Sequence, residues 1–169
     1  HQVSLLTRRA YIRQIASPSF SPSKTLAKAL LAQLPFEMTQ AQKRVSKEIV
    51  TDLKQNRPML RLVQGDVGAG KTLVAAVAAC HTLEAGWQVA LMAPTEILAE
   101  QHYLNFKRWF EPLGIQVAWL SGKQKGKART QAELTIKTGE AQLVVGTHAL
   151  FQDTVEFAKL GLVIIDEQH

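Results

Sequence analysis

A glycine-rich octapeptide between two apolar stretches constrains this chain most. Residues 65–72 read Gly-Asp-Val-Gly-Ala-Gly-Lys-Thr and fit the pattern G-x-x-x-x-G-K-[ST]. Apolar residues 59–63 precede it and alanine-rich residues 73–79 follow it, so we expect a strand, a loop and a helix. Glycines let backbone N–H groups converge, and the N-terminal end of the helix adds positive potential at the same place. The segment therefore predicts a site for nucleotide phosphates.

The residues of this loop would divide the work of binding a nucleotide. Lys71 would reach the β and γ phosphates, and the Thr72 hydroxyl would bind the Mg²⁺ that accompanies ATP. The backbone around the phosphates would come from Gly65, Asp66, Val67, Gly68, Ala69 and Gly70. The alternative is a glycine turn that arises by chance and binds nothing.

Length and composition indicate one soluble globular domain. The chain has 169 residues, of which 46% are hydrophobic and 20% charged, enough apolar material for a core. It shows no stretch as long as a membrane span and no secretory leader, so we expect a cytoplasmic protein without a membrane partner. The single Cys80 is expected to be a small buried hydrophobe rather than a reactive thiol.

The net charge of +6 is unevenly distributed along the chain. Residues 1–64 hold 11 Lys or Arg against 3 Asp or Glu, whereas residues 65–169 hold 9 against 11. Such asymmetry is typical of a section that faces nucleic acid, although an ordinary solvated helix surface would give the same counts. The basic cluster from Lys123 to Arg129 has the same two interpretations, a solvated loop or a contact with phosphates.

The first 34 residues are expected to form a helical connector from something upstream. Residues 1–16 have apolar side chains at near-helical spacing, and Ser23 can cap a second helix that runs to Leu34. A third helix is expected from a Thr39 cap to about Gln55.

Strands and helices then alternate to the end of the chain. Strands are expected at 59–63, 88–93, 116–120, 143–145 and 160–165. Helices are expected from the end of the phosphate loop to the glycine stop at Gly86, at 95–110 and at 126–137. This pattern predicts an α/β fold with a parallel sheet covered by helices on both faces. Ligands of such sheets bind beyond the carboxyl ends of the strands, where the phosphate loop lies.

Two acidic residues, Asp166 and Glu167, follow the last apolar strand. Their position suits two tasks: Asp166 can hold Mg²⁺, and Glu167 can orient and deprotonate the water that attacks the γ phosphate. The alternative is an acidic strand end that only keeps the edge of the sheet soluble.

Four segments together resemble motifs I, Ia, Ic and II of superfamily 2 DNA helicases. They are residues 65–72, Ala-Pro-Thr-Glu-Ile-Leu-Ala-Glu-Gln-His at 93–102, Val-Val-Gly-Thr-His-Ala-Leu at 144–150, and Ile-Ile-Asp-Glu-Gln-His at 164–169. The final Asp-Glu-Gln-His favours the bacterial branch-migrating helicases over transcription-repair translocases and primosomal helicases, which would be expected to end in Asp-Glu-Glu-His.

The resemblance implies roles that spacing cannot give. Phe36 would pack on adenine and Gln42 would read its edge, as in the helicase Q motif. The backbone of one DNA strand would be touched by Pro94, Thr95, Glu96, Gly146, Thr147 and His148. Thr95 can equally be a helix cap, and His148 can equally make a structural hydrogen bond.

The resemblance also implies the function and the partners of the whole protein to which these residues would belong. Residues 35–169 would be the N-terminal part of the first RecA-like, P-loop lobe of an ATP-hydrolysing DNA helicase that remodels stalled forks and Holliday junctions in recombination and repair. Its partners would be branched DNA, a wedge domain and a second RecA-like lobe, and it would be associated with the nucleoid. A nucleotide kinase or a non-catalytic nucleic-acid binding module would be the alternatives from other classes.

The resemblance further implies a strand after residue 169 that would lie between the phosphate-loop strand and the acidic strand. Without this strand and the second lobe, we expect residues 1–169 alone to fold poorly and to lack ATPase activity, because two rows of backbone groups would stay unpaired.

Overall fold

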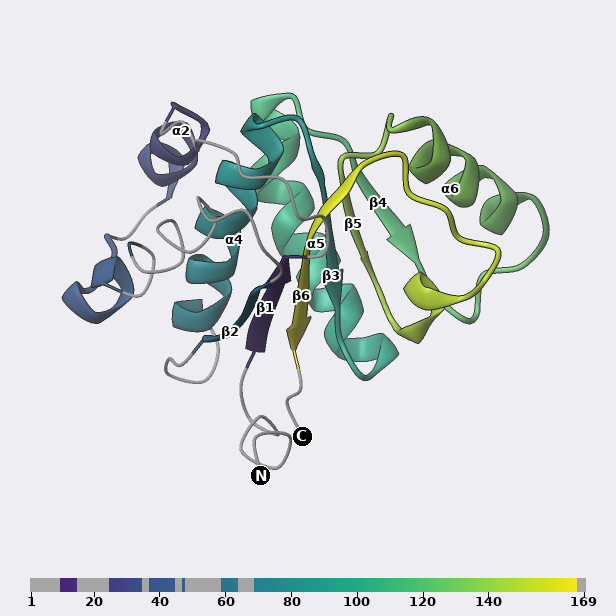
Figure 1. Cartoon of the computed structure of the whole chain (residues 1–169), viewed down its shortest axis with the longest axis horizontal. Helices are drawn as coiled ribbons and strands as arrows, with labels where there is room; N and C mark the ends of the chain where they lie inside the picture. Colours follow the sequence, from purple (N-terminus) through teal and green to yellow (C-terminus); the bar gives the residue numbers. More distant parts are fainter. Residues whose placement is uncertain are drawn as a thin grey trace.

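The strands of the chain form a mixed sheet with a parallel part that carries the site. The computed structural model describes residues 10–14, 25–34, 37–44, 47, 59–63 and 69–166. Across these residues the sheet has the order β2-β1-β6-β3-β5-β4 (Figure 1). The strands are β1 (Ala10–Gln14), β2 (Met59–Val63), β3 (Gln88–Met92), β4 (Val117–Leu120), β5 (Leu143–Gly146) and β6 (Leu160–Asp166). β6 pairs parallel with β3, β3 with β5, and β5 with β4, as the sequence predicts.

The helices begin and end close to the predicted residues. Those with both ends in the described residues are α2 (Thr25–Gln33), α4 (Ala69–Glu84), α5 (Glu96–Phe110) and α6 (Gly126–Thr138), with short 3-10 helices η2 (Glu111–Leu113) and η3 (His148–Phe151). Gly86 follows α4 with a φ of 93°, a left-handed conformation that stops a helix at little cost for glycine. Within the described part of the chain, no helix combines the length and apolar character needed to cross a membrane.

The parallel strands are buried on both faces, and this divides the core in two. Val89 and Leu91 of β3 pack in one cluster with side chains of α2, α4 and α5, whereas Ala90 and Met92 pack in the other with Ile136 of α6 and with η3. Successive residues of a strand point to opposite faces, so each strand serves both clusters. Helices therefore cover both faces of the sheet, which confirms the predicted α/β class.

The helix predicted over residues 1–16 is wrong at Ala10–Gln14, which form β1. This strand pairs antiparallel with β2 on one side, with Tyr11 opposite Leu62, and with β6 on the other, with Tyr11 opposite Ile165. Aromatic and β-branched residues such as Tyr11 and Ile12 suit a strand, and the backbone groups of two strand edges bind any extended segment that reaches them. β1 thus takes the place that the resemblance gives to a later strand. The backbone N–H and C=O groups of β2 and β6 that were expected to stay unpaired have β1 as their partner.

Cys80 tests the remaining prediction about the core, and the three tryptophans differ in how deeply they are buried. Cys80 is fully buried, and burial, with a smaller effect of the Glu84 charge, raises the pKa of its thiol, so the prediction of a buried hydrophobe is confirmed. Trp109 is buried in the core, whereas Trp87 and Trp119 are only half-buried. Trp87 lies beneath Lys159 Nζ, 4.6 Å from its ring centroid, and Trp119 contacts Tyr103.

The amino end of β3 is joined to three other segments by one buried amide. Gln88 Nε2 donates to the carbonyls of Ile136 (3.0 Å) and Ala141 (2.8 Å), and Gln88 Oε1 accepts from the backbone N–H of Lys159 (2.7 Å). Gln88 is only 4% exposed, so in this buried place it supplies hydrogen bonds that water would otherwise supply, although the Ile136 carbonyl also accepts from the N–H of Gly139.

Replacing Gln88 by leucine should therefore weaken the sheet although the volume is nearly kept. The Gln88→Leu variant leaves two carbonyls and one N–H without this partner, which should lower the free energy of local unfolding by about 2–4 kcal/mol. Hydrogen exchange of the β3 and β5 amides in the full-length protein measures the change. Gln142→Leu, which removes one exposed hydrogen bond to Gln116, is the matched control. Equal protection of β3 in the Gln88→Leu variant and the parent would contradict this account.

Candidate nucleotide site

The position of Asp166 follows from the alternation of side chains along β6. Leu162 and Ile164 belong to the core cluster under α4 and α5, whereas Val163 belongs to the cluster on the other face. Asp166 continues the first series, so its carboxylate lies at the carboxyl end of the strand on the side of α4 and α5. Parallel sheets deliver ligand-binding groups to this edge.

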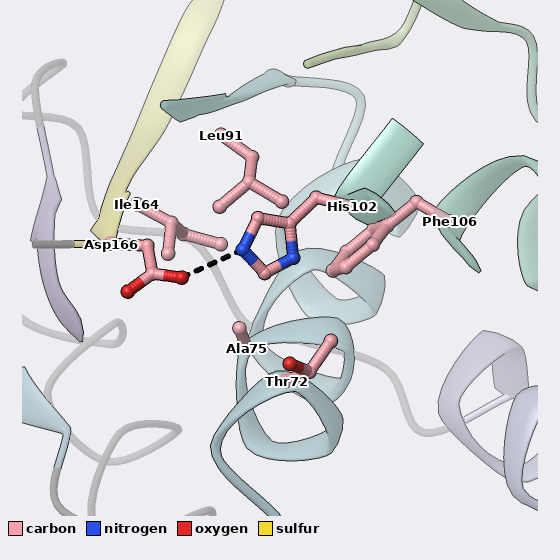
Figure 2. Close-up of a pocket in the computed structure, with 7 residues that line it drawn as sticks. All are labelled: Thr72, Ala75, Leu91, His102, Phe106, Ile164 and Asp166. Atoms are coloured by element: carbon pink, nitrogen blue, oxygen red, sulfur yellow. Dashed lines mark hydrogen bonds and ion pairs between the residues drawn. The ribbon is translucent and has the colours of Figure 1, made fainter. Parts of the chain in front are cut away.

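Asp166 is hydrogen-bonded to a histidine of α5. His102 Nε2 lies 2.7 Å from Asp166 Oδ2, and the side chains of His102 and Asp166 are 13% and 3% exposed (Figure 2). The geometry is that of an imidazole N–H that donates to a carboxylate. The pair joins the second turn of α5 to the end of β6.

Thr72 lies on α4 beside this pair. Figure 2 shows Thr72 and Ala75 on α4 below Asp166 and His102, with Leu91 and Ile164 above them in this view. Thr72 and Asp166, predicted as the two Mg²⁺ ligands, thus line the same small cavity.

A hydroxyl and a carboxylate are hard oxygen ligands, and Mg²⁺ at nucleotide sites takes one or two such ligands from the protein and the rest from phosphate and water. The residues therefore fit Mg²⁺. Within the described ranges, no cluster of three or more His, Cys, Asp or Glu side chains offers an all-protein cage instead.

Several predicted site residues lie outside the described residues. These are Phe36, the loop residues Gly65, Asp66, Val67 and Gly68, and Glu167. Ala69, Gly70 and Lys71 form the first turn of α4, so the predicted loop leads directly into a helix N-terminus. Their roles toward phosphate and water stay predictions.

Gln42 has a structural partner in its own helix. Its Oε1 accepts from the backbone N–H of Thr39 (2.8 Å), and its own N–H donates to Thr39 Oγ1 (3.1 Å). This reciprocal pair is a capping box, which confirms Thr39 as the cap of a helix that begins at Gln40. This bond uses one acceptor position of Gln42 Oε1, and the Gln42 NH₂ group takes no part in it, so the predicted contact with adenine stays a prediction.

The residues that match motif Ia surround the start of α5. Thr95 Oγ1 accepts from the N–H of Leu98 at 3.2 Å, so the predicted helix cap is confirmed, and Thr95 is exposed. Glu96 accepts a hydrogen bond from Ser121 Oγ at 2.5 Å, which ties α5 to the loop after β4. Pro94 is half-buried. Thr95 is therefore the residue of this motif with an exposed, uncharged polar side chain. Glu96 carries a negative charge, which would repel a phosphate.

The residues that match motif Ic differ in exposure. A Cβ on Gly146 would lie 1.9 Å from the carbonyl oxygen of Leu120, so glycine is required where β4 and β5 approach. Thr147 is buried and accepts from the N–H of Ala149 at 3.5 Å. The His148 side chain is exposed and makes no hydrogen bond to the described residues, which leaves it accessible to a ligand. The structural hydrogen bond considered for His148 is absent within that part of the chain.

The last residue of the basic cluster, Arg129, has a structural role. Arg129 donates to Glu133 Oε2 (2.6 Å), to the carbonyl of Ser121 (3.0 Å) and to Gln152 Oε1 (2.6 Å), so it joins α6 to the two loops beside it. Lys123, Lys125 and Lys127 are exposed.

His102 is the residue of this site to which the sequence motifs assigned no role. The sequence offered one indication of a role: His102 is the last residue of the motif segment 93–102, seven residues after the Thr95 cap. Its partner Asp166 is far away in the chain, so only the packing of α5 against β6 reveals the pair.

A family model described as DEAD/DEAH box helicase matches residues 39–169. ATP-dependent DNA helicase RecG of Escherichia coli O157:H7 is 57% identical over the whole chain, and that of Pasteurella multocida is 59% identical. The chain spans 24% of the length of each of these relatives.

A solved structure titled "Structure of RecG bound to three-way DNA junction" superimposes with a TM-score of 0.78 at 41% identity, over 86% of this chain and 20% of that one. The fold is accordingly that of a RecA-like helicase lobe. The chain therefore belongs to the DEAD/DEAH box helicase family, and along its length it is similar to one part of ATP-dependent DNA helicase RecG.

Proposed function

We propose that this chain is the ATP-binding part of a DNA helicase motor that hydrolyses ATP to drive branch migration and the remodelling of stalled forks and Holliday junctions. The observation that carries the proposal is that Thr72 and Asp166 line one cavity, with Thr72 near the start of α4, the helix that follows the predicted phosphate loop. The similarity to RecG, and a relative solved on a three-way DNA junction, support branched DNA as the substrate.

Each residue has a separate task in this proposal. Lys71 binds the β and γ phosphates, Thr72 and Asp166 hold Mg²⁺, and Glu167 accepts a proton from the attacking water. Bound Mg²⁺ supplies charge neutralisation on the phosphates. Phe36 and Gln42 select adenine.

The DNA strand is gripped through its backbone, which suits a motor because such contacts carry no sequence information. Exposed Thr95 and His148 offer side chains for this contact. Gly146 and Thr147 are buried and contribute by shaping the loop, and Glu96 by holding Ser121.

Lys71→Ala in the full-length protein should reduce ATP hydrolysis to less than about a tenth of the parental rate, because the charge on the phosphates is lost. Binding to forked DNA should stay close to parental, since the predicted DNA contacts lie on other strand ends. Phosphate release and DNA affinity are measured on the same preparations. Lys137→Ala, at an exposed position of α6 outside the basic cluster, is the control. Hydrolysis above a tenth of the parental rate would rule out the assignment of the phosphate loop.

Glu167→Gln should keep ATP binding but slow turnover by about 100-fold or more, as expected when a general base is removed. Equilibrium binding of ATP and single-turnover hydrolysis separate the two effects. Glu156→Gln, at an exposed position, controls for the loss of one negative charge. Loss of ATP binding in the Glu167→Gln variant would instead make Glu167 a metal ligand.

DNA dependence separates this function from the two other classes. A helicase motor releases phosphate faster when forked DNA is added, a nucleotide kinase requires a small acceptor, and a binding module turns over nothing. Phosphate release by the full-length parent with and without forked DNA therefore decides between them.

A further inference from the structure

We propose that His102 is a positioning residue that fixes the Asp166 carboxylate in the orientation needed to bind the Mg²⁺ of a bound nucleotide. The proposal rests on the proposed function, because Mg²⁺ is expected here only with a nucleotide.

The first argument is the contact itself. Asp166 is 2% exposed, and a buried carboxylate requires hydrogen bonds to replace lost water. His102 Nε2, 2.7 Å from Oδ2, provides one at the distance of a strong charge-assisted bond. A bond to one oxygen restricts rotation of the carboxylate and thereby sets the direction of the other oxygen.

The second argument is that the imidazole is itself held in place. The ring of Phe106, one helical turn further along α5, lies at 83° to the His102 ring with centroids 6.4 Å apart. Phe106 is fully buried and stacks on Phe110 with centroids 5.6 Å apart. The orientation of His102 is therefore set by the core, before any ligand binds.

The third argument is the chemistry of metal ligands. Carboxylates that bind metals are usually oriented by a hydrogen bond from a second residue, and loss of that residue typically lowers metal affinity about 10- to 100-fold. His102 is placed to act in this way: it contacts Asp166, and it lines the same cavity as Thr72.

Two polar substitutions of different reach test the proposal in the full-length helicase. The amide nitrogen of glutamine reaches about as far as His Nε2, whereas that of asparagine reaches only as far as Nδ1. His102→Gln should keep the bond to Asp166, and His102→Asn should lose it. His102→Leu, which fills space without a donor, is a second variant that loses the bond, and Gln101→Asn at the exposed neighbouring position is the control.

The readout is equilibrium binding of a fluorescent N-methylanthraniloyl ADP, with and without Mg²⁺, which requires no turnover. In the His102→Asn and His102→Leu variants, the gain in affinity caused by Mg²⁺ should fall about 10-fold or more. Affinity without Mg²⁺ should be unchanged in all variants, and His102→Gln should retain most of the gain.

Three outcomes would overturn the proposal: a parental Mg²⁺ effect in a folded variant that lacks the donor, an equal loss in His102→Gln and His102→Asn, or no Mg²⁺ effect in the parent. Failure of the proposed function looks different, because the parent would then bind no nucleotide at all, or Lys71→Ala would hydrolyse ATP like the parent.

Discussion

The pairing of β3 with both β5 and β6 is the constraint on which the rest of the structure depends. Ala90 lies opposite Val144 on one side and Val163 on the other, so β3 is enclosed by parallel neighbours and is apolar on both faces. A strand in this position needs helices above and below it, and β3, β5 and β6 then end at the same edge. The predicted Mg²⁺ ligands Thr72 and Asp166 lie at this edge because α4 begins there and β6 ends there. Thr95 and His148 lie there because they follow the ends of β3 and β5.

Helix α5 connects two regions that have separate tasks in the proposed function. Its first turn is capped by Thr95, which is exposed, and its second turn carries His102 against Asp166. Phe106, Trp109 and Phe110 anchor the rest of the helix in the core. Because a well-packed helix moves as one body, a displacement of its first turn also moves the partner of Asp166. In the proposed function, α5 therefore carries both a proposed DNA contact, Thr95, and the partner of a proposed Mg²⁺ ligand, Asp166.

β1 shows how tertiary context overrides a local pattern. Its apolar residues have spacing compatible with a helix, yet the edges of β2 and β6 offer backbone hydrogen bonds on both sides. An extended segment satisfies both edges, whereas a helix would satisfy neither. An antiparallel strand thereby enters an otherwise parallel sheet at the position between the phosphate-loop strand and the acidic strand.

Sequence alone was sufficient for those features that depend on local chemistry. The alternation of apolar segments predicted β3 to β6 and α4 to α6, the glycine at 86 marked the end of a helix, and the spacing of motifs predicted that Thr72 and Asp166 would meet. Tertiary structure decided what depends on residues distant in the chain: the strand at Ala10–Gln14, the steric need for Gly146, and the bond between His102 and Asp166. The reason is that periodicity reports which face of an element is buried, whereas the identity of its partner depends on how the elements pack.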